Sequence, residues 1–138
     1  MPTTYLSNPT VNVTSPSAMA LTTSCSAAVL TLTAEALENT SFGSTSRTYT
    51  AGLFSNELTL TLFQGYGTTE VETYLNTLFG VASTIVVSPS GTTESASNPE
   101  YTLTGCYLET VTPINTTVGE LSVVEAVFKG GTYARDIT

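Results

Sequence analysis

The residues of this chain that could carry catalysis or bind a metal are its eleven acidic side chains and two cysteines, because it contains no histidine. Histidine is the commonest general base and the commonest metal ligand, so its absence removes most enzyme and metal chemistries. Cys25 and Cys106 lie far apart in the sequence and lack the paired spacing of a zinc site. The carboxylates are therefore the groups that remain to be tested.

None of the carboxylate pairs has the spacing of a reactive or cation-binding site. Glu70 and Glu72 are two residues apart and point away from one another on a helix, where they favour its positive N-terminal end. Glu94 and Glu100 flank a polar loop, but calcium needs more converging oxygens than this loop offers. The glycine-bearing stretch at residues 65–67 lacks the lysine of a phosphate-binding loop. The sequence predicts no enzyme, no cofactor and no metal.

The composition indicates a single domain with a weakly charged, acidic surface. A chain of 138 residues can fold around one core, and residues 1–138 are predicted to form one domain. Its formal net charge is −8, and the three basic residues are Arg47, Lys129 and Arg135. Binding to nucleic acid depends on basic side chains that neutralise phosphates, so adhesive DNA binding is excluded. An acidic surface can still lie beside DNA and repel it.

No stretch of the chain predicts a membrane anchor or a secretion signal. A membrane-spanning helix needs roughly 20 apolar residues, and the first ten residues lack the basic and apolar regions of a signal peptide. We therefore expect the chain to be made and folded in a cytoplasm. Cys25 and Cys106 are expected to be reduced and buried, and a disulfide between them is the alternative.

Alternating polar and apolar residues predict strands in the first half of the chain. Residues 28–36 have this period, although the helix formers in AEALE compete at the end of the strand. Residues 47–50 are expected to form a short strand that turns at Ala51 and Gly52. In the clearest strand, residues 57–63, every second residue is a leucine and the polar side is rich in threonine.

One helix, at about residues 69–79, is predicted to interrupt these strands. Thr69 and Glu72 have the spacing of a capping box, and Gly80 stands where a left-handed C-terminal cap is expected. One side of the helix is apolar and must pack on a sheet or on a neighbouring subunit. The packing residues are predicted to be Val71, Leu75, Leu78 and Phe79.

Further strands are predicted at residues 83–88, 101–111 and 121–128, so the fold class is mainly β, a β-sandwich or barrel with one flanking helix. Residues 1–24 contain three prolines and are expected to form an extended N-terminal arm, and residues 129–138 a C-terminal tail. Lysine and proline are scarce in the strands, although they commonly protect open sheet edges. Pairing between subunits in a ring would remove such edges.

The chain also resembles a known family. The passages LENTSFGSTSRTYTAGL (37–53), LTLTLFQGYGTTEVETYLNTLFG (58–80), SNPEYT (97–102) and TVGELSVV (117–124) are similar to the major tail proteins, or tail tube proteins, of long-tailed phages. The resemblance implies a β-sandwich with one helix that assembles into hexameric rings. These rings would stack into a hollow tube through which DNA is ejected. The implied location is the phage tail, assembled in the cytoplasm of the host bacterium.

The same resemblance implies partners and a lumen surface. The partners would be further copies of the chain and other tail proteins, such as the tape measure, tail tip and tail terminator proteins. DNA would pass through without specific binding, beside lumen residues expected at Glu35, Glu57, Thr59 and Thr61. An ordinary solvated sheet face is the alternative for each of these positions. Alternatives for the whole chain are a capsid decoration or head-tail joining protein and a monomeric immunoglobulin-like binding module.

Overall fold

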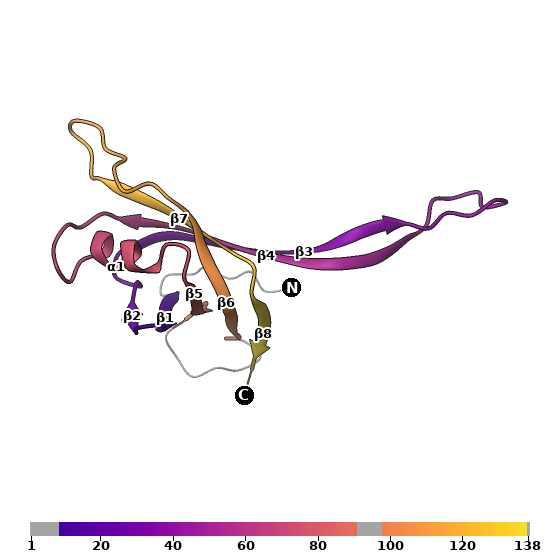
Figure 1. Cartoon of the computed structure of the whole chain (residues 1–138), viewed down its shortest axis with the longest axis horizontal. Helices are drawn as coiled ribbons and strands as arrows, with labels where there is room; N and C mark the ends of the chain where they lie inside the picture. The colour runs from indigo at the N-terminus through magenta and orange to yellow at the C-terminus, as the bar shows by residue number, and fades with distance from the viewer. Residues whose placement is uncertain (1–8, 91–97, 138) are drawn as a thin grey trace.

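The computed structural model describes residues 9–90 and 98–137 of the chain. These residues form an eight-stranded antiparallel sheet with one α-helix (Figure 1), which agrees with the predicted mainly-β class. The strand order is β2-β1-β5-β6-β7-β4-β3, and β8 pairs with β6 beside this path. The elements are β1 (Thr10–Ser15), β2 (Met19–Ala20), β3 (Cys25–Glu38), β4 (Tyr49–Phe63), α1 (Val71–Leu78), β5 (Ala82–Ser88), β6 (Glu100–Val111), β7 (Val123–Lys129) and β8 (Thr132–Asp136).

The longest elements, β3 and β4, form a hairpin that extends well beyond the rest of the molecule (Figure 1). The predicted short strand at residues 47–50 and the turn at Ala51 and Gly52 are wrong, because β4 runs without interruption from Tyr49 to Phe63. The register shift between Ala34 and Ala36 accommodates one extra residue of β4, so Gly52 lies within the length of the ladder. Strand pairing also overrides the helix propensity of AEALE, which lies in β3.

Helix α1 spans Val71–Leu78, inside the predicted range. The predicted capping box is wrong: the N-cap residue is Glu70, which makes no side-chain cap hydrogen bond. The backbone N–H of Glu72 instead donates to the Gly65 carbonyl at 3.1 Å, so the preceding turn satisfies one end group of the helix. Gly80 follows the C-cap with a φ of 75°, the left-handed conformation expected there.

The two terminal segments lie largely within the sheet. Of the predicted N-terminal arm, residues 1–8 are outside the described residues, whereas β1 pairs with β5 and buries Val11 and Val13. Of the predicted C-terminal tail, residues 132–136 form β8, which pairs with β6. Both segments pair because each has extended, partly apolar sequence that completes an open edge of β5 or β6.

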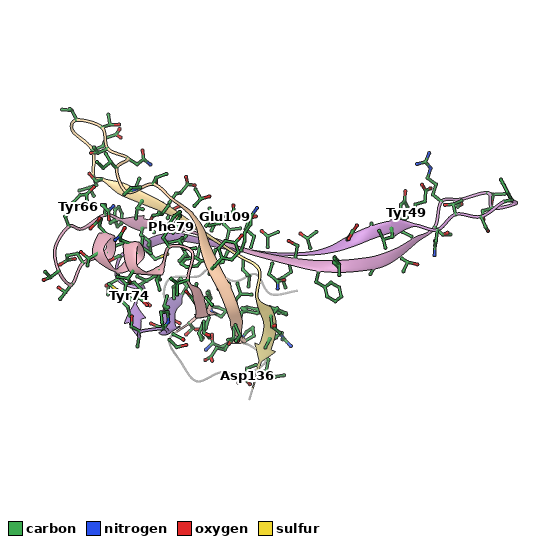
Figure 2. The ribbon with its side chains drawn as sticks, viewed as in Figure 1. Tyr49, Tyr66, Tyr74, Phe79, Glu109 and Asp136 are labelled. Atoms are coloured by element: carbon green, nitrogen blue, oxygen red, sulfur yellow. The ribbon has the colours of Figure 1, made fainter. Side chains whose placement is uncertain are left out.

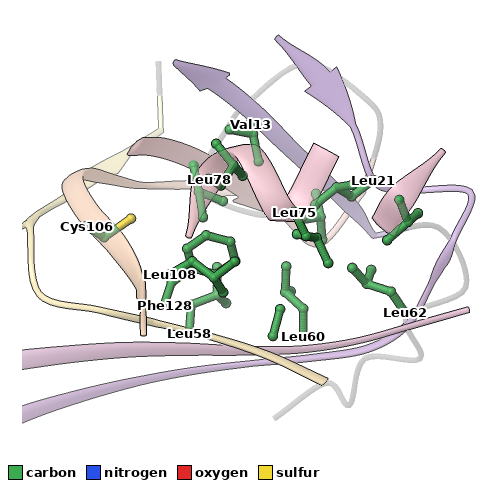
Figure 3. Packing of buried hydrophobic residues seen from close by; sticks show 14 of the residues in the cluster. Val13, Leu21, Leu58, Leu60, Leu62, Leu75, Leu78, Cys106, Leu108 and Phe128 are labelled. Atoms are coloured by element: carbon green, nitrogen blue, oxygen red, sulfur yellow. The ribbon is translucent and has the colours of Figure 1, made fainter. Parts of the chain in front are cut away.

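The core lies where α1, β1 and β5 cover the inner half of β4 and β7. Figure 3 shows Leu58, Leu60 and Leu62 of β4 pointing toward Leu75 and Leu78 of α1, and all five are at most 1% exposed. Val71 is also buried. The fourth residue expected on this face of the helix, Phe79, differs: it is the C-cap residue, outside the last helical turn, and is 56% exposed (Figure 2).

Candidate assembly surfaces

The outer part of the β3–β4 hairpin exposes apolar side chains that no other element covers. Strand β4 pairs with β7 only from Glu57 to Phe63, so its outer residues pair with β3 alone. We call residues 32–56 the distal hairpin; Figure 2 shows Tyr49 near its outer end. Soluble monomers rarely expose a large contiguous apolar patch without a partner. The exposed large apolar residues of the distal hairpin are Leu32, Leu37, Phe42, Tyr49, Leu53 and Phe54.

Strand β3 is also an open edge of the sheet. It stands at one end of the strand order and is 14 residues long, so a row of its backbone N–H and C=O groups faces away from β4. Such an edge is a template for pairing with another strand. Strand β3 contains neither lysine nor proline, the residues that most often protect an edge. An apolar surface and an unpaired edge therefore coincide on one hairpin.

A mixed polar face lies on the side of the sheet opposite the core. Glu57, Thr59 and Thr61 alternate with the buried leucines of β4, so their side chains share this face and are half-buried. The Thr59 hydroxyl donates to Glu57 Oε1 at 3.5 Å. Three of the four predicted lumen residues are therefore together on one surface. Glu35 is not among them: it is exposed in the distal hairpin, where its Oε2 lies against Gly52.

Lysine and glutamate side chains meet on this polar face. Lys129 Nζ lies 3.9 Å from Glu57 Oε2 and 3.5 Å from Glu109 Oε1. All three side chains are 37–44% exposed, so solvent screens the pairs and each contributes about 1 kcal/mol or less. Glu125 lies on the same face beside Thr61 and keeps the carboxylates in excess. The face is thus mildly anionic, with its described cation held between two acids.

Sequence reasoning missed the Glu109 contact and the distal apolar surface. The contact depends on a register shift between β6 and β7 near Leu108, which brings Glu109 beside Lys129 and which no sequence period reveals. The apolar surface did leave a signal. Leu53 and Phe54 are consecutive and so lie on opposite faces of β4, which is typical of a strand with two faces to cover.

The remaining candidate groups do not form a reactive site in the described residues. Cys25 and Cys106 are free thiols on different strands; Cys106 is buried, as predicted, whereas the predicted burial of Cys25 is wrong, because it stands at the partly exposed start of β3. Burial raises the pKa of both, that of Cys106 to about 11, so the nucleophilic thiolate is disfavoured. Residues 9–90 and 98–137 contain no group of three His, Cys, Asp or Glu side chains that could hold a metal, and Glu94 lies outside them.

Within residues 9–90 and 98–137, no helix has the length and apolarity to cross a bilayer. Helix α1 has eight residues, whereas a spanning helix needs about 20.

Known proteins resemble this chain in structure rather than in sequence. No family model and no curated protein matches the chain. Solved structures do match it over nearly its full length. A chain of the virion of a native gene transfer agent (GTA) particle has a TM-score of 0.75 and 11% identity, with 97% of this chain and 99% of that chain covered.

Two further solved structures have the same arrangement. A chain of the tail of an empty GTA particle, a structure with C6 symmetry, has a TM-score of 0.72 and 12% identity over 99% of both chains. A chain of the SPP1 tail tube has a TM-score of 0.70 and 9% identity, over 95% of this chain and 77% of that one. The chain therefore has a tail tube fold, and the resemblance seen in the sequence is confirmed at the level of the fold.

Proposed function

We propose that this protein is a structural subunit of a hollow phage tail tube, built from hexameric rings that stack around the path of the ejected DNA. The observation that carries the proposal is the distal hairpin: a long hairpin with an unpaired edge and apolar residues on its surface. The tail tube fold supports it, because relatives of that fold come from a C6-symmetric tail and from a tail tube.

The energetics of the distal hairpin favour neighbouring copies as its partners. Leu53 is 81% exposed and Phe54 77% exposed in the single chain. Burying a side chain of this kind contributes roughly 1.5 to 3 kcal/mol. Assembly into stacked rings would supply this burial in every subunit, and ring closure would also pair the β3 edge. A heterologous contact that repeats around an axis yields a closed ring when the rotation closes.

The polar face of the sheet is the proposed lining of the bore. Glu57, Thr59 and Thr61 present hydroxyl and carboxylate groups, and Lys129 is held by two glutamates. DNA binding gains its affinity from cations that displace counterions. A lining with paired lysine and excess carboxylate would let DNA pass without adhesion. Glu35, in the distal hairpin, would lie at a different level of the bore or at a subunit contact.

The lining is tested by reversing its charge. The double variant Glu57→Lys, Thr59→Lys should form tubes of normal appearance but slow the passage of the genome, because two cations per subunit would face DNA phosphates. The measurement is the rate of DNA ejection from particles that carry the variant. The double variant Thr68→Lys, Glu70→Lys, in the exposed turn before α1, changes the charge by the same amount outside the face and serves as the control. Wild-type ejection by the double variant would exclude these positions from the bore.

Other tail proteins are the proposed partners at the two ends of the tube, including the tape measure, tail tip and tail terminator proteins. The protein would be made in the host cytoplasm and become part of the virion tail. Its proposed role is structural and needs no catalytic residue.

Electron microscopy of the purified protein tests the proposal directly. We expect rings and hollow tubes at high protein concentration, formed alone or when seeded with tail tips from the same virion. Seeding is included because tube growth can require an initiator. A compact monomer that persists at high concentration, even with seeds, would overturn the proposal. Particles that bind only to a capsid lattice or a portal would indicate a capsid decoration or joining protein instead.

A further inference from the structure

An apolar groove opens between the distal hairpin and β8. It consists of two adjoining hollows with volumes of about 590 and 470 Å³, which share Leu32 and Tyr133 in their walls. Phe54 lines the first hollow, and Leu30 and Tyr101 line the second. Tyr101 and Tyr133 stack with ring centroids 6.1 Å apart, and both rings line the second hollow. We call this surface the hairpin groove.

The hairpin groove is a fixed feature of the fold, because the sheet forks there. Strand β4 follows β7 up to Lys129, after which Gly130 and Gly131 turn the chain onto β6 as β8. Asn56 is buried at the fork, and its side-chain Nδ2 donates to the Gly131 carbonyl at 3.0 Å. The Gly130 N–H donates in turn to the Asn56 carbonyl at 3.0 Å. These two bonds tie the turn that leads into β8 to β4 at the fork.

A second apolar surface lies on the loop of residues 112–122 between β6 and β7, at the end of the molecule opposite the hairpin tip (Figure 1). Ile114 and Leu121 are each 77% exposed, and Val118 is fully exposed. The loop is nevertheless held in place: Gln64 Nε2 and the Tyr66 hydroxyl both donate to the Pro113 carbonyl, at 2.8 and 2.7 Å. A loop anchored in this way presents its apolar residues outward at little entropic cost on binding.

We propose that the 112–122 loop of one copy of this chain occupies the hairpin groove of the next copy, and that this contact joins successive rings. The inference rests on the proposed function and adds the contact that would propagate the tube. The loop lies at one end of the long axis and β8, which borders the groove, lies near its middle (Figure 1), so two different surfaces would meet and the contact is heterologous, or head-to-tail. Head-to-tail contacts that do not close generate open polymers.

Charge complementarity supports this choice of occupant. Glu120 is the one charged residue of the loop. Arg135 lies two residues beyond Tyr133 on the same face of β8, at the rim of the groove. Arg47 and Lys129 both form ion pairs, whereas Arg135 forms none with the described residues. Glu120 of one copy would provide the missing acid for Arg135 of the next.

The tip of the hairpin is a poorer occupant than the loop. Its exposed large apolar residue is Phe42, and its polar groups already bond to one another. Asn39 Nδ2 donates to Thr50 Oγ1 at 2.7 Å, and the Thr48 hydroxyl donates to Asn39 Oδ1 at 2.7 Å. The 112–122 loop offers three apolar side chains to a groove that is itself mostly apolar.

Crosslinking between engineered thiols tests the contact. In a Cys25→Ser background, Val118→Cys on the loop and Thr132→Cys beside the groove are combined, and assemblies are treated with a short bismaleimide. Cys25 is removed because it is half-exposed, whereas Cys106 is buried. We expect a ladder of crosslinked oligomers on a denaturing gel, because each copy contributes both thiols to a head-to-tail chain. Each single variant should stop at dimers, and micrographs of the same samples report tube formation.

The outcomes separate the contact from the proposed function. Tubes without a ladder would refute the loop-in-groove contact and leave the tube function intact. A ladder without tubes would support the contact and count against the tube. Neither tubes nor a ladder would count against both. A ladder from Phe42→Cys combined with Thr132→Cys, in place of the Val118 pair, would show that the hairpin tip occupies the groove and would overturn the inference.

Charge reversal gives a second, independent measurement. Glu120→Arg and Arg135→Glu, each alone, should shorten or abolish tubes, and the two together should restore them. Both side chains are exposed, so neither change threatens folding. If the double variant assembles no better than the single variants, the two residues do not pair, and the proposed seating of the loop is wrong.

Discussion

Both halves of β4 carry large apolar side chains, but these side chains lie in opposite environments. In the inner half, Leu58, Leu60 and Leu62 are 0% exposed because α1, β1 and β5 cover them. In the outer half, Leu53 and Phe54 are 81% and 77% exposed, since only β3 lies beside them. Burial in this strand is therefore decided by whether a second layer is present. The outer half has the side chains of a core without the layer that would complete one.

This difference assigns folding and assembly to separate parts of one strand. Each inner leucine stabilises the single chain by roughly 1.5 to 3 kcal/mol. The outer residues can make such a contribution only when another molecule covers them. Substitutions in the two halves should accordingly affect different measurements, and that separation can be tested.

Introducing a charge into each region should give the largest contrast. Leu75→Asp removes a buried side chain that faces the inner leucines and places a carboxylate in the core, at a cost of about 4 kcal/mol or more. Domain stabilities are about 5 to 15 kcal/mol, so this variant should be largely unfolded. Leu53→Asp should retain the melting temperature of the wild type and lose assembly. Circular dichroism reports the first property and electron microscopy the second.

Phe79→Asp is the matched control, because Phe79 is also apolar and adjoins the helix but is 56% exposed. It should unfold the protein far less than Leu75→Asp does. If Leu53→Asp unfolds the isolated chain, or if it still forms tubes, the division of β4 into a folding half and an assembly half is wrong.

The inner half was predictable from sequence, and the outer half was not. Strict alternation over residues 57–63 and apolar residues three and four apart in 71–78 each specify an element and its buried face. In the outer half, Ala51 and Gly52 resemble a turn. The long ladder with β3 overrides that local signal, because the register shift near Ala34 accommodates the one extra residue of β4.

The candidate surfaces were likewise predictable only where the strand is regular. Glu57, Thr59 and Thr61 could be grouped on one face because alternation fixes side-chain direction within a regular strand. Glu35 could not be placed, since it lies at a register shift where alternation is interrupted. The hairpin groove was also beyond prediction. It arises where β4 and β8 diverge, and that fork depends on long-range pairing rather than on any local period.

A substitution at the fork between β4 and β8 should affect both folding and assembly, because the inner and outer halves of β4 meet there. Gly131 has a φ of 84°, and an added Cβ would lie 2.8 Å from the Cys106 backbone nitrogen. Gly131→Ala should therefore cost about 3 kcal/mol or more, from left-handed strain together with a clash that backbone atoms cannot relieve. Gly130 has nearly the same φ, 83°, but open space around it, so Gly130→Ala should cost about 1 to 2 kcal/mol.

Denaturant unfolding of both variants measures the difference. Equal costs would mean that strain alone matters and that the close approach of Gly131 to β6 is not maintained in solution. Gly131→Ala could also weaken crosslinking at the hairpin groove. That result would show that the fork sets the shape of the groove as well as the stability of the core.

The two cysteines should make the stability of the protein depend on pH, and this effect is expected to be smaller than that of the substitutions above. Cys106 is fully buried in the body, and burial raises its pKa from 9.0 to about 11. Cys25, at the base of the hairpin, is half-exposed, and burial raises its pKa too. A pKa raised by folding means that the unfolded chain loses its proton first. The stabilisation is therefore complete below pH 9 and is lost as the pH rises to about 11.

The loss attributable to Cys106 should reach about 3 kcal/mol, because each pKa unit corresponds to about 1.4 kcal/mol. Unfolding free energies measured from pH 8 to 11 should fall less steeply in Cys106→Ala than in the wild type. Burial also raises the pKa of Tyr74, so some alkaline loss should remain in every variant. Cys25→Ala is the control and should keep most of the wild-type slope. If the unfolding free energies of the two variants have the same dependence on pH, the core shields Cys106 from solvent no better than the start of β3 shields Cys25. The contrast between a closed core and an open hairpin would then not extend to this end of β3.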